Sequence, residues 1–317
     1  MLSRVYRVHL DFAVEPSPGP RSVVVKIATT DPEQLLAAEL LGFYHREVWM
    51  YTNIAGQLPY RTPEVFLAAV SDDGRATTLV LEDLRRARPV DQVRGAMWRE
   101  VCLGIDALAA QHARFENTPL VSSVGSVCRS LSDPVYPTVL PMLFEPGWEL
   151  AREVCGDRIS PQLSRFGDRW SVECGELLRR LMERPTLLHG DFRADNLFVD
   201  RGGLIVTDFQ IAGLGAGAFD LAYFVSQSVG PTRRRSRDLR IVERYVAGLG
   251  AHGAPSRFGT TWREYRTALL ACLVYPVAAF RSWESKNPRG RALIEAMFTR
   301  AAATIESTEA LELVSDV

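Results

Sequence analysis

The N-terminal part of the chain is patterned as short β-strands. Residues 5–10 and 22–28 are rich in β-branched side chains, and residues 15–20 between them are mostly Pro, Ser and Gly, which favour turns. This pattern predicts a β-hairpin. Two further apolar runs, at residues 64–70 and 77–81, predict a second pair of strands.

A helix is predicted between these two pairs of strands. Asp31 occupies an N-cap position, Pro32 follows at the first helical position, and Gln34 lies where a capping box would close. The residues that follow place an apolar stripe on one helical face. Its members are Leu36, Leu40, Tyr44, Val48 and Tyr51. We therefore expect one helix that continues through residue 51.

The remainder of the chain is patterned mainly as helices. Residues 92–115 have a helical period of apolar positions, and most of the chain after Leu84 does as well. One exception is a hairpin signal, in which residues 197–199 and 204–206 flank a Gly-containing turn. The prediction is an α+β protein with a β-rich part, residues 1–82, and a larger α-rich part, residues 83–317.

Composition narrows the functional classes. The chain has 317 residues and a formal net charge of −1, which argues against nucleic acid as a partner because phosphate binding needs surplus Lys and Arg. Its five cysteines are scattered and form no C-x-x-C pair, so we predict a reducing, cytoplasmic location. The longest apolar run, residues 268–280, is too short to span a membrane. Composition leaves the oligomeric state open.

The isolated hairpin brings two possible metal ligands together. If its turn centres on Gly202, Asn196 and Asp208 are equally distant from the centre and face each other across the strands. Two hard oxygen ligands suit Mg²⁺, which also takes phosphate oxygens and water. Asp191 lies five residues before Asn196, in a loop where its carboxylate could accept the proton of an attacking hydroxyl.

The segment 189–196, His-Gly-Asp-Phe-Arg-Ala-Asp-Asn, resembles the H-G-D-x-x-x-x-N catalytic loop of the aminoglycoside phosphotransferase and choline kinase superfamily. Residues 208–210, Asp-Phe-Gln, resemble the counterpart of the protein-kinase D-F-G. Asp220 resembles the aspartate that braces the loop backbone. The resemblance implies a protein-kinase-like, two-lobed fold, in which Asp191 is the catalytic base and Asn196 and Asp208 bind Mg²⁺.

The N-terminal half fits the same resemblance. The strand around Lys26 is similar to the one that carries the phosphate-gripping lysine, and Glu47 resembles its glutamate partner. Glu39 is an outside candidate for that partner. Residues 79–84 resemble the hinge between lobes, where the backbone of Glu82 and Leu84 would hydrogen-bond the adenine edge of ATP.

The chain departs from this pattern at its start. Kinases place a phosphate-covering loop between their first two strands, and Met1 falls where that loop is expected. Ser3 would be a remnant of the loop. We therefore expect either that the first strand has been lost or that the chain begins late and lacks part of its phosphate cover.

Several residues have simpler interpretations beside the functional ones. His189 is interpreted as a histidine that orients the catalytic loop, and His112 as a packing residue. Asp195 is interpreted as a loop or surface carboxylate, and the basic run at residues 233–237 as a solvated face. None of these four is predicted to take part in the reaction.

The resemblance implies an ATP-dependent kinase whose acceptor is a hydroxyl group of a small molecule, namely a metabolite, an amino alcohol or an antibiotic. A protein kinase is disfavoured, because the twelve positions from Asp208 to Asp220 leave no room for a peptide-docking segment. A pseudokinase that binds nucleotide without catalysis is the alternative. The sequence of residues 220–224 is similar to that of the choline-kinase-like and ecdysteroid-kinase-like branches.

Overall fold

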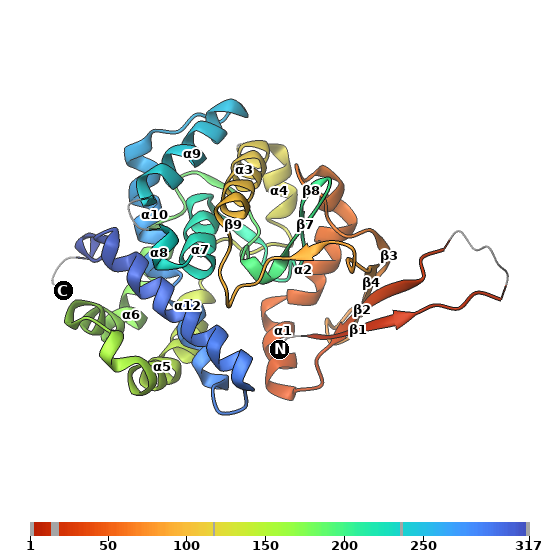
Figure 1. Ribbon diagram of the computed structural model, residues 1–317, viewed down its shortest axis with the longest axis horizontal. Helices are drawn as coiled ribbons and strands as arrows, with labels where there is room; N and C mark the ends of the chain where they lie inside the picture. The colour runs from red at the N-terminus through yellow and green to blue at the C-terminus, as the bar shows by residue number, and fades with distance from the viewer. Residues whose placement is uncertain (1–2, 14–18, 117, 235–236, 315–317) are drawn as a thin grey trace. The chain divides into compact units, whose positions relative to one another are not determined.

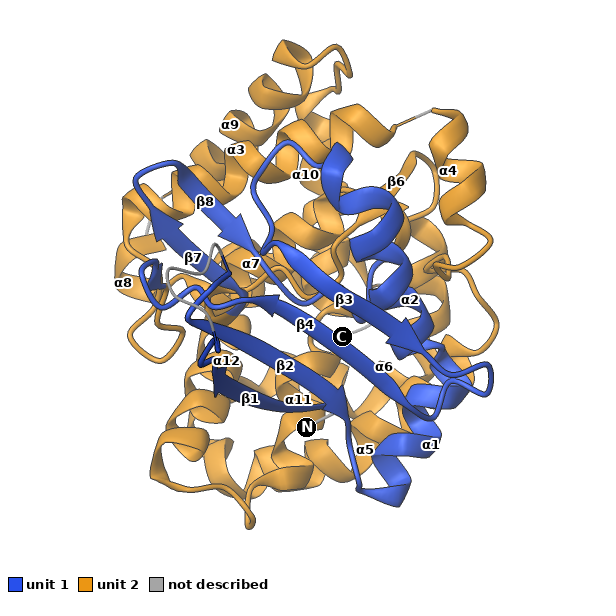
Figure 2. Cartoon of the chain, turned by 90° about the vertical axis from the view of Figure 1, so that its right-hand side faces the viewer, with its two compact units in different colours: residues 1–89, 196–212 blue, residues 90–195, 213–317 orange. Residues whose placement is uncertain are grey.

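The computed structural model describes residues 3–13, 19–116, 118–234 and 237–314. These residues fold into two compact units (Figure 2), which we call unit 1, residues 1–89 and 196–212, and unit 2, residues 90–195 and 213–317. Unit 1 contains an antiparallel sheet and unit 2 is mainly helical (Figure 1). The predicted α+β class, with a β-rich part and a larger helical part, is confirmed. The lobe boundary after residue 82 stays a prediction.

The sheet of unit 1 has four antiparallel strands in the order β1-β2-β4-β3. Both predicted strand pairs are confirmed, although residues 14–18 of the predicted turn lie outside the described residues. The two central strands, β2 and β4, each have a hydrogen-bonded neighbour at both edges. Their buried apolar side chains are Val23, Leu79 and Leu81, and the other apolar side chains of these strands are half-buried. The bounds are β1 Ser3–His9, β2 Ser22–Ala28, β3 Val65–Val70 and β4 Thr77–Glu82.

The single helix predicted through residue 51 is wrong. The chain forms α1 (Pro32–Leu41) and α2 (Phe43–Trp49), separated by Gly42 with a left-handed φ of 70°, and continues as a short π-helix, Met50–Ile54. Asp31 caps α1 as predicted, because its carboxylate accepts from the amides of the second and third residues after it. The break turns the first half of the predicted apolar stripe outward, so that Leu40 is 59% exposed.

The isolated hairpin is confirmed, but its register is not the predicted one. Strands β7 (Leu197–Asp200) and β8 (Gly203–Val206) pair with Asp200 opposite Gly203. The turn therefore centres between residues 201 and 202, and Asn196 lies opposite Thr207 rather than Asp208. A short strand β5, Arg88–Pro89, joins the outer edge of β7.

Unit 2 is built around α3 (Trp98–Phe115), which begins six residues later than predicted. Gly95 has φ 78°, a conformation that a helix cannot continue, and the Met97 amide donates to Glu100 at the true start. The other helices are α4 Pro119–Val124, α5 Tyr136–Cys155, α6 Pro161–Arg180, α7 Ala218–Ser228, α8 Pro231–Arg234, α9 Asp238–Ala251, α10 Phe258–Ala271, α11 Val274–Ala279 and α12 Pro288–Ser307.

Two short strands in unit 2 were not predicted. β6 (Pro185–Leu188) and β9 (Gly213–Ala216) form an antiparallel pair that leads directly into the segment of His189. The interpretation of residues 233–237 as a solvated face is wrong for Arg234, which is buried and donates to the Ala303 carbonyl over 2.8 Å. Residues 235 and 236 lie outside the described residues.

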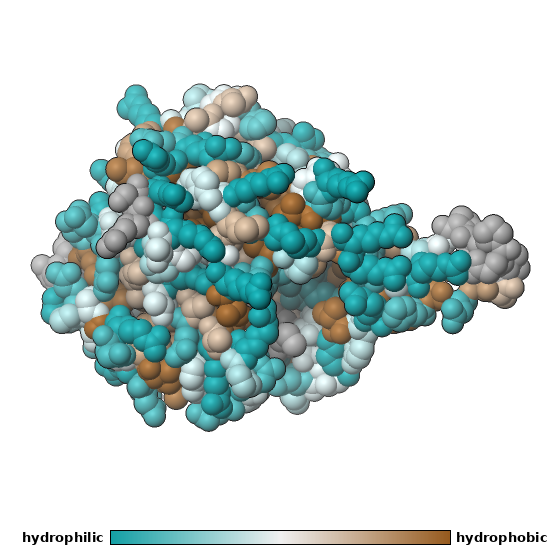
Figure 3. All heavy atoms as spheres, in the orientation of Figure 1, coloured by the Kyte–Doolittle hydropathy of each residue, from teal (hydrophilic) through white to brown (hydrophobic). Residues whose placement is uncertain are grey.

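The surface of the molecule is mixed in character. Hydrophilic residues predominate on the face in Figure 3, and hydrophobic residues are scattered among them. Within the described ranges, no helix is both long enough and apolar enough to cross a membrane.

Candidate active site

In unit 1, the side chain of Lys26 joins two of the predicted site residues. Its Nζ lies 2.7 Å from Glu47 Oε1 and 3.1 Å from Asp208 Oδ1. The lysine comes from β2, the glutamate from α2, and the aspartate from the segment after β8. Glu39, the outside candidate, instead pairs with Arg75 over 2.9 Å. The structure thus brings Lys26, Glu47 and Asp208 together.

The Lys26 ammonium is held in its charged form. Burial opposes the charge, but the carboxylates of Glu47 and Asp208 outweigh that effect and raise the pKa of Lys26 above its ordinary value. Lys26 and Glu47 are 7% and 1% exposed, so water screens their interaction little. Unit 1 therefore presents a fixed positive charge, oriented by one fully buried carboxylate and one that is about a third exposed.

Asp208 has a backbone conformation that is unusual for a residue with a side chain. Its φ is 71°, a region that costs a non-glycine residue about 1–3 kcal/mol and that occurs often at functional sites. Its amide donates to the Tyr51 hydroxyl over 3.3 Å, and the Tyr51 ring meets Phe209 edge to face at 5.2 Å. These contacts hold the strained residue in place.

The residues beside Asp208 are held by a buried polar group that the sequence did not reveal. Arg46, only 1% exposed, donates to the carbonyls of Gln210 and Leu41. The Gln210 side chain donates to the Ser3 hydroxyl over 2.8 Å. Ser3 is itself a strand residue of β1, paired with Ala28, and the interpretation of it as part of a phosphate loop is therefore wrong.

Asn196 and Asp208 lie at the same end of the β7–β8 hairpin. The Asn196 carbonyl accepts from the amide and the hydroxyl of Thr207, the neighbour of Asp208, over 3.0 and 3.2 Å. A side-chain amide oxygen and a carboxylate are hard donors, which suit Mg²⁺ when phosphate oxygens and water complete its coordination. The donor set fits that ion. In the observed register, however, Asn196 lies opposite Thr207, so the pairing of the strands does not place Asn196 and Asp208 directly opposite each other.

The predicted hinge residues lie at the end of β4. The Glu82 amide donates to the Glu64 carbonyl, and the Ala87 amide donates to the Leu84 carbonyl, both over 2.8 Å. The Glu82 side chain turns toward Arg61, to which it is ion-paired. The segment is therefore fixed by hydrogen bonds on both sides of residue 83.

In unit 2, the loop that contains Asp191 is anchored by Asp220. The Asp220 carboxylate accepts from the amides of His189 and Gly190 over 2.6 and 2.9 Å. Gly190 has φ 79°, which favours glycine. The Asp191 amide faces His189 Nδ1 at 3.2 Å. The bracing contact implied by the resemblance is present, and His189 orients the loop as interpreted.

The Asp191 carboxylate receives two side-chain donors that the sequence analysis did not identify. The Tyr223 hydroxyl and Arg193 Nε donate to Asp191 Oδ1 over 2.7 and 3.0 Å. Arg193 also contacts Asp195, whose carboxylate accepts from the Gln92 amide. The interpretation of Asp195 as a surface carboxylate is therefore incomplete. Only the spacing of Asp220 and Tyr223 on one helix could have indicated the tyrosine.

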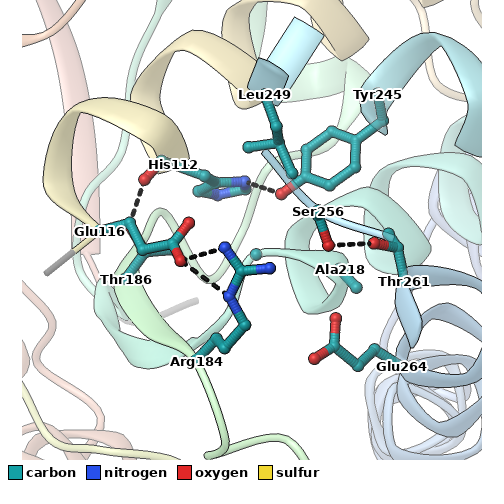
Figure 4. A pocket seen from close by; sticks show the side chains of 11 residues that line it. His112, Glu116, Arg184, Thr186, Ala218, Tyr245, Leu249, Ser256, Thr261 and Glu264 are labelled. Carbon is teal, nitrogen blue, oxygen red and sulfur yellow. Dashed lines mark hydrogen bonds and ion pairs between the residues drawn. The ribbon is translucent and has the colours of Figure 1, made fainter. Parts of the chain in front are cut away.

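Behind the loop, His112 links Asp220 to a small pocket (Figure 4). His112 Nδ1 lies 2.7 Å from the Tyr245 hydroxyl, and its Nε2 lies 3.3 Å from Asp220 Oδ2. His112 therefore has a polar as well as a packing role. On the other wall, Arg184 is ion-paired with Glu116.

Glu264 points into the same pocket without a partner for one oxygen. Its Oε1 is buried and has no hydrogen-bond partner among the described residues. Burial raises the pKa of Glu264 to about 7, although the Arg184 charge opposes the shift. The cavity itself is about 20 Å³, which is enough for a water molecule.

The fold resembles solved kinases at low sequence identity. A choline kinase from Cryptosporidium parvum matches with a TM-score of 0.56 and 9% identity, over 99% of this chain and 92% of that one. A Plasmodium vivax ethanolamine kinase matches with a TM-score of 0.55 and 10% identity, over 92% and 78%. The GDP complex of aminoglycoside 2'-phosphotransferase-IIIa matches with a TM-score of 0.52 and 12% identity, over 94% and 93%.

These likenesses confirm the predicted protein-kinase-like fold. No curated protein sequence matches the chain. The model of one sequence family, described as the phosphotransferase enzyme family, matches residues 9–266. This match spans strands β2–β9, helices α1–α9 and part of α10, and so includes both groups of residues described above. The chain belongs to the phosphotransferase enzyme family.

Proposed function

We propose that this protein transfers the γ-phosphoryl group of ATP to a hydroxyl group of a small molecule. The observation that supports this most directly is the buried Lys26 ammonium, 2.7 Å from Glu47 and 3.1 Å from Asp208. Only Lys26 and Lys286 are lysines among the 37 basic residues of the sequence. A compact ammonium at position 26 suits phosphate oxygens, and the rarity of lysine elsewhere supports a specific requirement for it.

In this proposal, unit 1 binds the nucleotide. Lys26 contacts the phosphates, and Glu47 keeps the lysine extended from β2. The backbone carbonyl of Glu82 and the backbone N–H of Leu84 form hydrogen bonds with the adenine edge. Asn196 and Asp208 would hold Mg²⁺, which would supply positive charge to neutralise the phosphate oxygens. The kinases similar in fold include complexes with GDP, so ATP and GTP should be compared directly.

Asp191 is proposed as the base. Its carboxylate accepts the proton of the acceptor hydroxyl as the hydroxyl oxygen attacks the γ-phosphorus. A new oxygen–phosphorus bond forms, the bond between the γ-phosphorus and the β–γ bridging oxygen breaks, and ADP leaves. The hydrogen bonds of Asp220 to the His189 and Gly190 amides support a rigid loop, which such a base needs.

The acceptor is proposed to be an amino alcohol, another hydroxylated metabolite or an antibiotic. The kinases with similar folds include an ethanolamine kinase, a choline kinase, an aminopropanol kinase and an aminoglycoside phosphotransferase. Ethanolamine, choline, aminopropanol and aminoglycosides each carry a hydroxyl group together with an amino or quaternary ammonium group. They form the first panel, together with neutral sugars and polyols, so that a requirement for the amine is also tested. Membership of the ecdysteroid-kinase-like branch stays a prediction.

The test is a screen for Mg²⁺-dependent ADP release with this panel and with ATP or GTP. We expect one acceptor class to stimulate release, and we expect Asp191→Asn to reduce the stimulated rate by about 10³-fold. Asp157→Asn is the matched control, because Asp157 is 84% exposed. Stimulated transfer that survives intact in Asp191→Asn would contradict the assignment of the base.

The pseudokinase alternative gives a different result in the same experiment. It is favoured if ATP raises the melting temperature while no acceptor stimulates ADP release. If neither ATP nor GTP shifts the melting temperature, with or without Mg²⁺, the nucleotide site itself is wrong.

A further inference from the structure

Two side chains of helix α7 hold the loop that contains Asp191. Asp220, near the start of the helix, binds the backbone amides of His189 and Gly190. Tyr223, three residues later, binds the side chain of Asp191 over 2.7 Å. Residues three apart lie on one face of a helix. A single turn of α7 therefore fixes both the path of the loop and the direction of its carboxylate.

The Tyr223 hydroxyl is well suited to act as a permanent donor. The residue is 2% exposed, and its ring packs against Tyr275 with the ring centroids 4.3 Å apart. Burial, followed by the charge of Asp191, raises the pKa of Tyr223 well above its ordinary value. The phenol therefore stays protonated, and its packing allows the hydroxyl little freedom to turn away from the carboxylate.

A second donor meets the same carboxylate oxygen from another direction. Arg193 Nε lies 3.0 Å from Asp191 Oδ1, and Arg193 is itself held by Asp195 and by the Gln92 side chain. Two donors at one oxygen restrict rotation about the bond that carries the carboxyl group. A buried hydroxyl could contact Asp191 merely to satisfy its own hydrogen bond. The common target of Tyr223 and Arg193 favours control of the carboxylate.

We infer that Tyr223 is a positioning residue, which holds the Asp191 carboxylate in the orientation that proton transfer requires. The inference rests on the proposed function, in which Asp191 is the base. Tyr223 takes no proton and forms no bond to the phosphoryl group. Its contribution is geometric, and its loss leaves the carboxylate present but less often aligned with the incoming hydroxyl.

The test uses the full chain and Tyr223→Phe, which removes the hydroxyl and keeps the ring. The probe is Mg²⁺·ATP with water as the acceptor, followed as ADP release, because this reaction needs no identified second substrate. We expect kcat to fall by about 10- to 100-fold while KM for ATP stays within about 2-fold. Tyr265→Phe is the control, because Tyr265 is also buried but its hydroxyl has no hydrogen-bond partner among the described residues.

A double variant separates positioning from a general structural effect. If Tyr223 acts through Asp191, adding Tyr223→Phe to Asp191→Asn lowers the single-turnover rate no further, since residues that act as a unit are not additive. Losses that multiply would overturn the inference. So would a loss that appears in KM for ATP with kcat unchanged.

The remaining outcomes distinguish the inference from the proposed function. If Asp191→Asn keeps the full rate, the proposed base is wrong and the inference fails with it. If Asp191→Asn is inactive but Tyr223→Phe is not slower, the inference alone is wrong. Crystal structures give a readout without turnover, since we expect the Asp191 carboxylate to rotate in Tyr223→Phe. An unchanged carboxylate in that variant would overturn the inference.

Discussion

The two units hold their candidate site residues by different physical means. In unit 1, Lys26 lies between two carboxylates, so charge balances charge. In unit 2, the buried carboxylate of Asp220 is bound by two backbone amides and faces His112. A buried ion pair is costly when one partner is removed, because the other charge stays behind. A buried carboxylate that is bound by backbone amides is stabilised only while the loop keeps the conformation that presents those amides.

This difference predicts that Lys26→Met causes the largest loss of stability. The change leaves the buried Glu47 carboxylate without its counter-charge, and we expect the free energy of unfolding to fall by about 3–5 kcal/mol. The measurement is urea denaturation monitored by circular dichroism. Lys286→Met is the matched control, since it removes the other lysine of the sequence, and it should lower the free energy by less than about 1 kcal/mol.

The double variant Lys26→Met/Glu47→Met sharpens this result. Removing both charges should recover most of the lost stability while nucleotide binding stays absent. If the double variant is as unstable as Lys26→Met, packing of the lysine stem rather than the unbalanced charge explains the loss. The stability of unit 1 would then not depend on the balance between these two charges.

Asp220→Asn tests the other side of the comparison. The amide group of asparagine can face only one of the two backbone donors with its oxygen, and its own N–H groups oppose the other donor. We expect a loss of about 2–3 kcal/mol in unfolding free energy, together with a lower rate of phosphoryl transfer. Asp106→Asn is the control, because that aspartate forms an exposed ion pair with Arg244. Equal losses in the two variants would contradict an anchoring role for Asp220.

The sequence predicted the parts of unit 1 and of the loop that depend on local patterns. The strands, the Asp31 cap and the linear motif around Asp191 follow from neighbours in the chain. The end of α1 was missed because the apolar stripe continues past Gly42, whereas Gly42 ends the helix with a left-handed φ and its amide donates to the carbonyls of Ala38 and Glu39. The hairpin register was off by one residue because the turn type decides it.

The missed site residues depend on contacts across long stretches of sequence. Tyr223 meets Asp191 only because α7 packs behind the loop, 32 positions further along the chain. Arg46 reaches Gln210 across 164 positions. Neither contact leaves a periodic signal in the sequence. By contrast, Lys26, Glu47 and Asp208 were found by resemblance, and the structure brings all three together in unit 1.

Gly217→Ala probes how closely the network behind the loop is packed. A Cβ at this position would lie 2.3 Å from the Tyr245 hydroxyl and 2.5 Å from His112 Nδ1, which is too close for either group to remain in place. We expect a loss of about 1–3 kcal/mol in unfolding free energy. Gly259→Ala is the matched control, because a Cβ there meets nothing within 4 Å. A neutral Gly217→Ala would show that this side of unit 2 adapts easily.

The smallest expected effect comes from Glu264, a half-buried carboxyl group that has neither the counter-charge of Glu47 nor the amides of Asp220. Its pKa of about 7 lies above the ordinary value of 4.5, so between these values the folded chain binds a proton that the unfolded chain has released. Stability from the protonated group is therefore full below about pH 4.5, and it is lost as the pH rises through about 7.

Glu264→Gln keeps the shape of the protonated group but cannot ionise. At pH 5 its unfolding free energy should therefore be close to that of the unmodified chain. At pH 8 the variant should be more stable by about 1 kcal/mol, after allowance for the partial exposure of the group to water. Urea denaturation at both pH values measures the difference. A gain of the same size at pH 5 would point to packing, whereas a gain only at pH 8 shows that an unpartnered charge in the pocket is the cost.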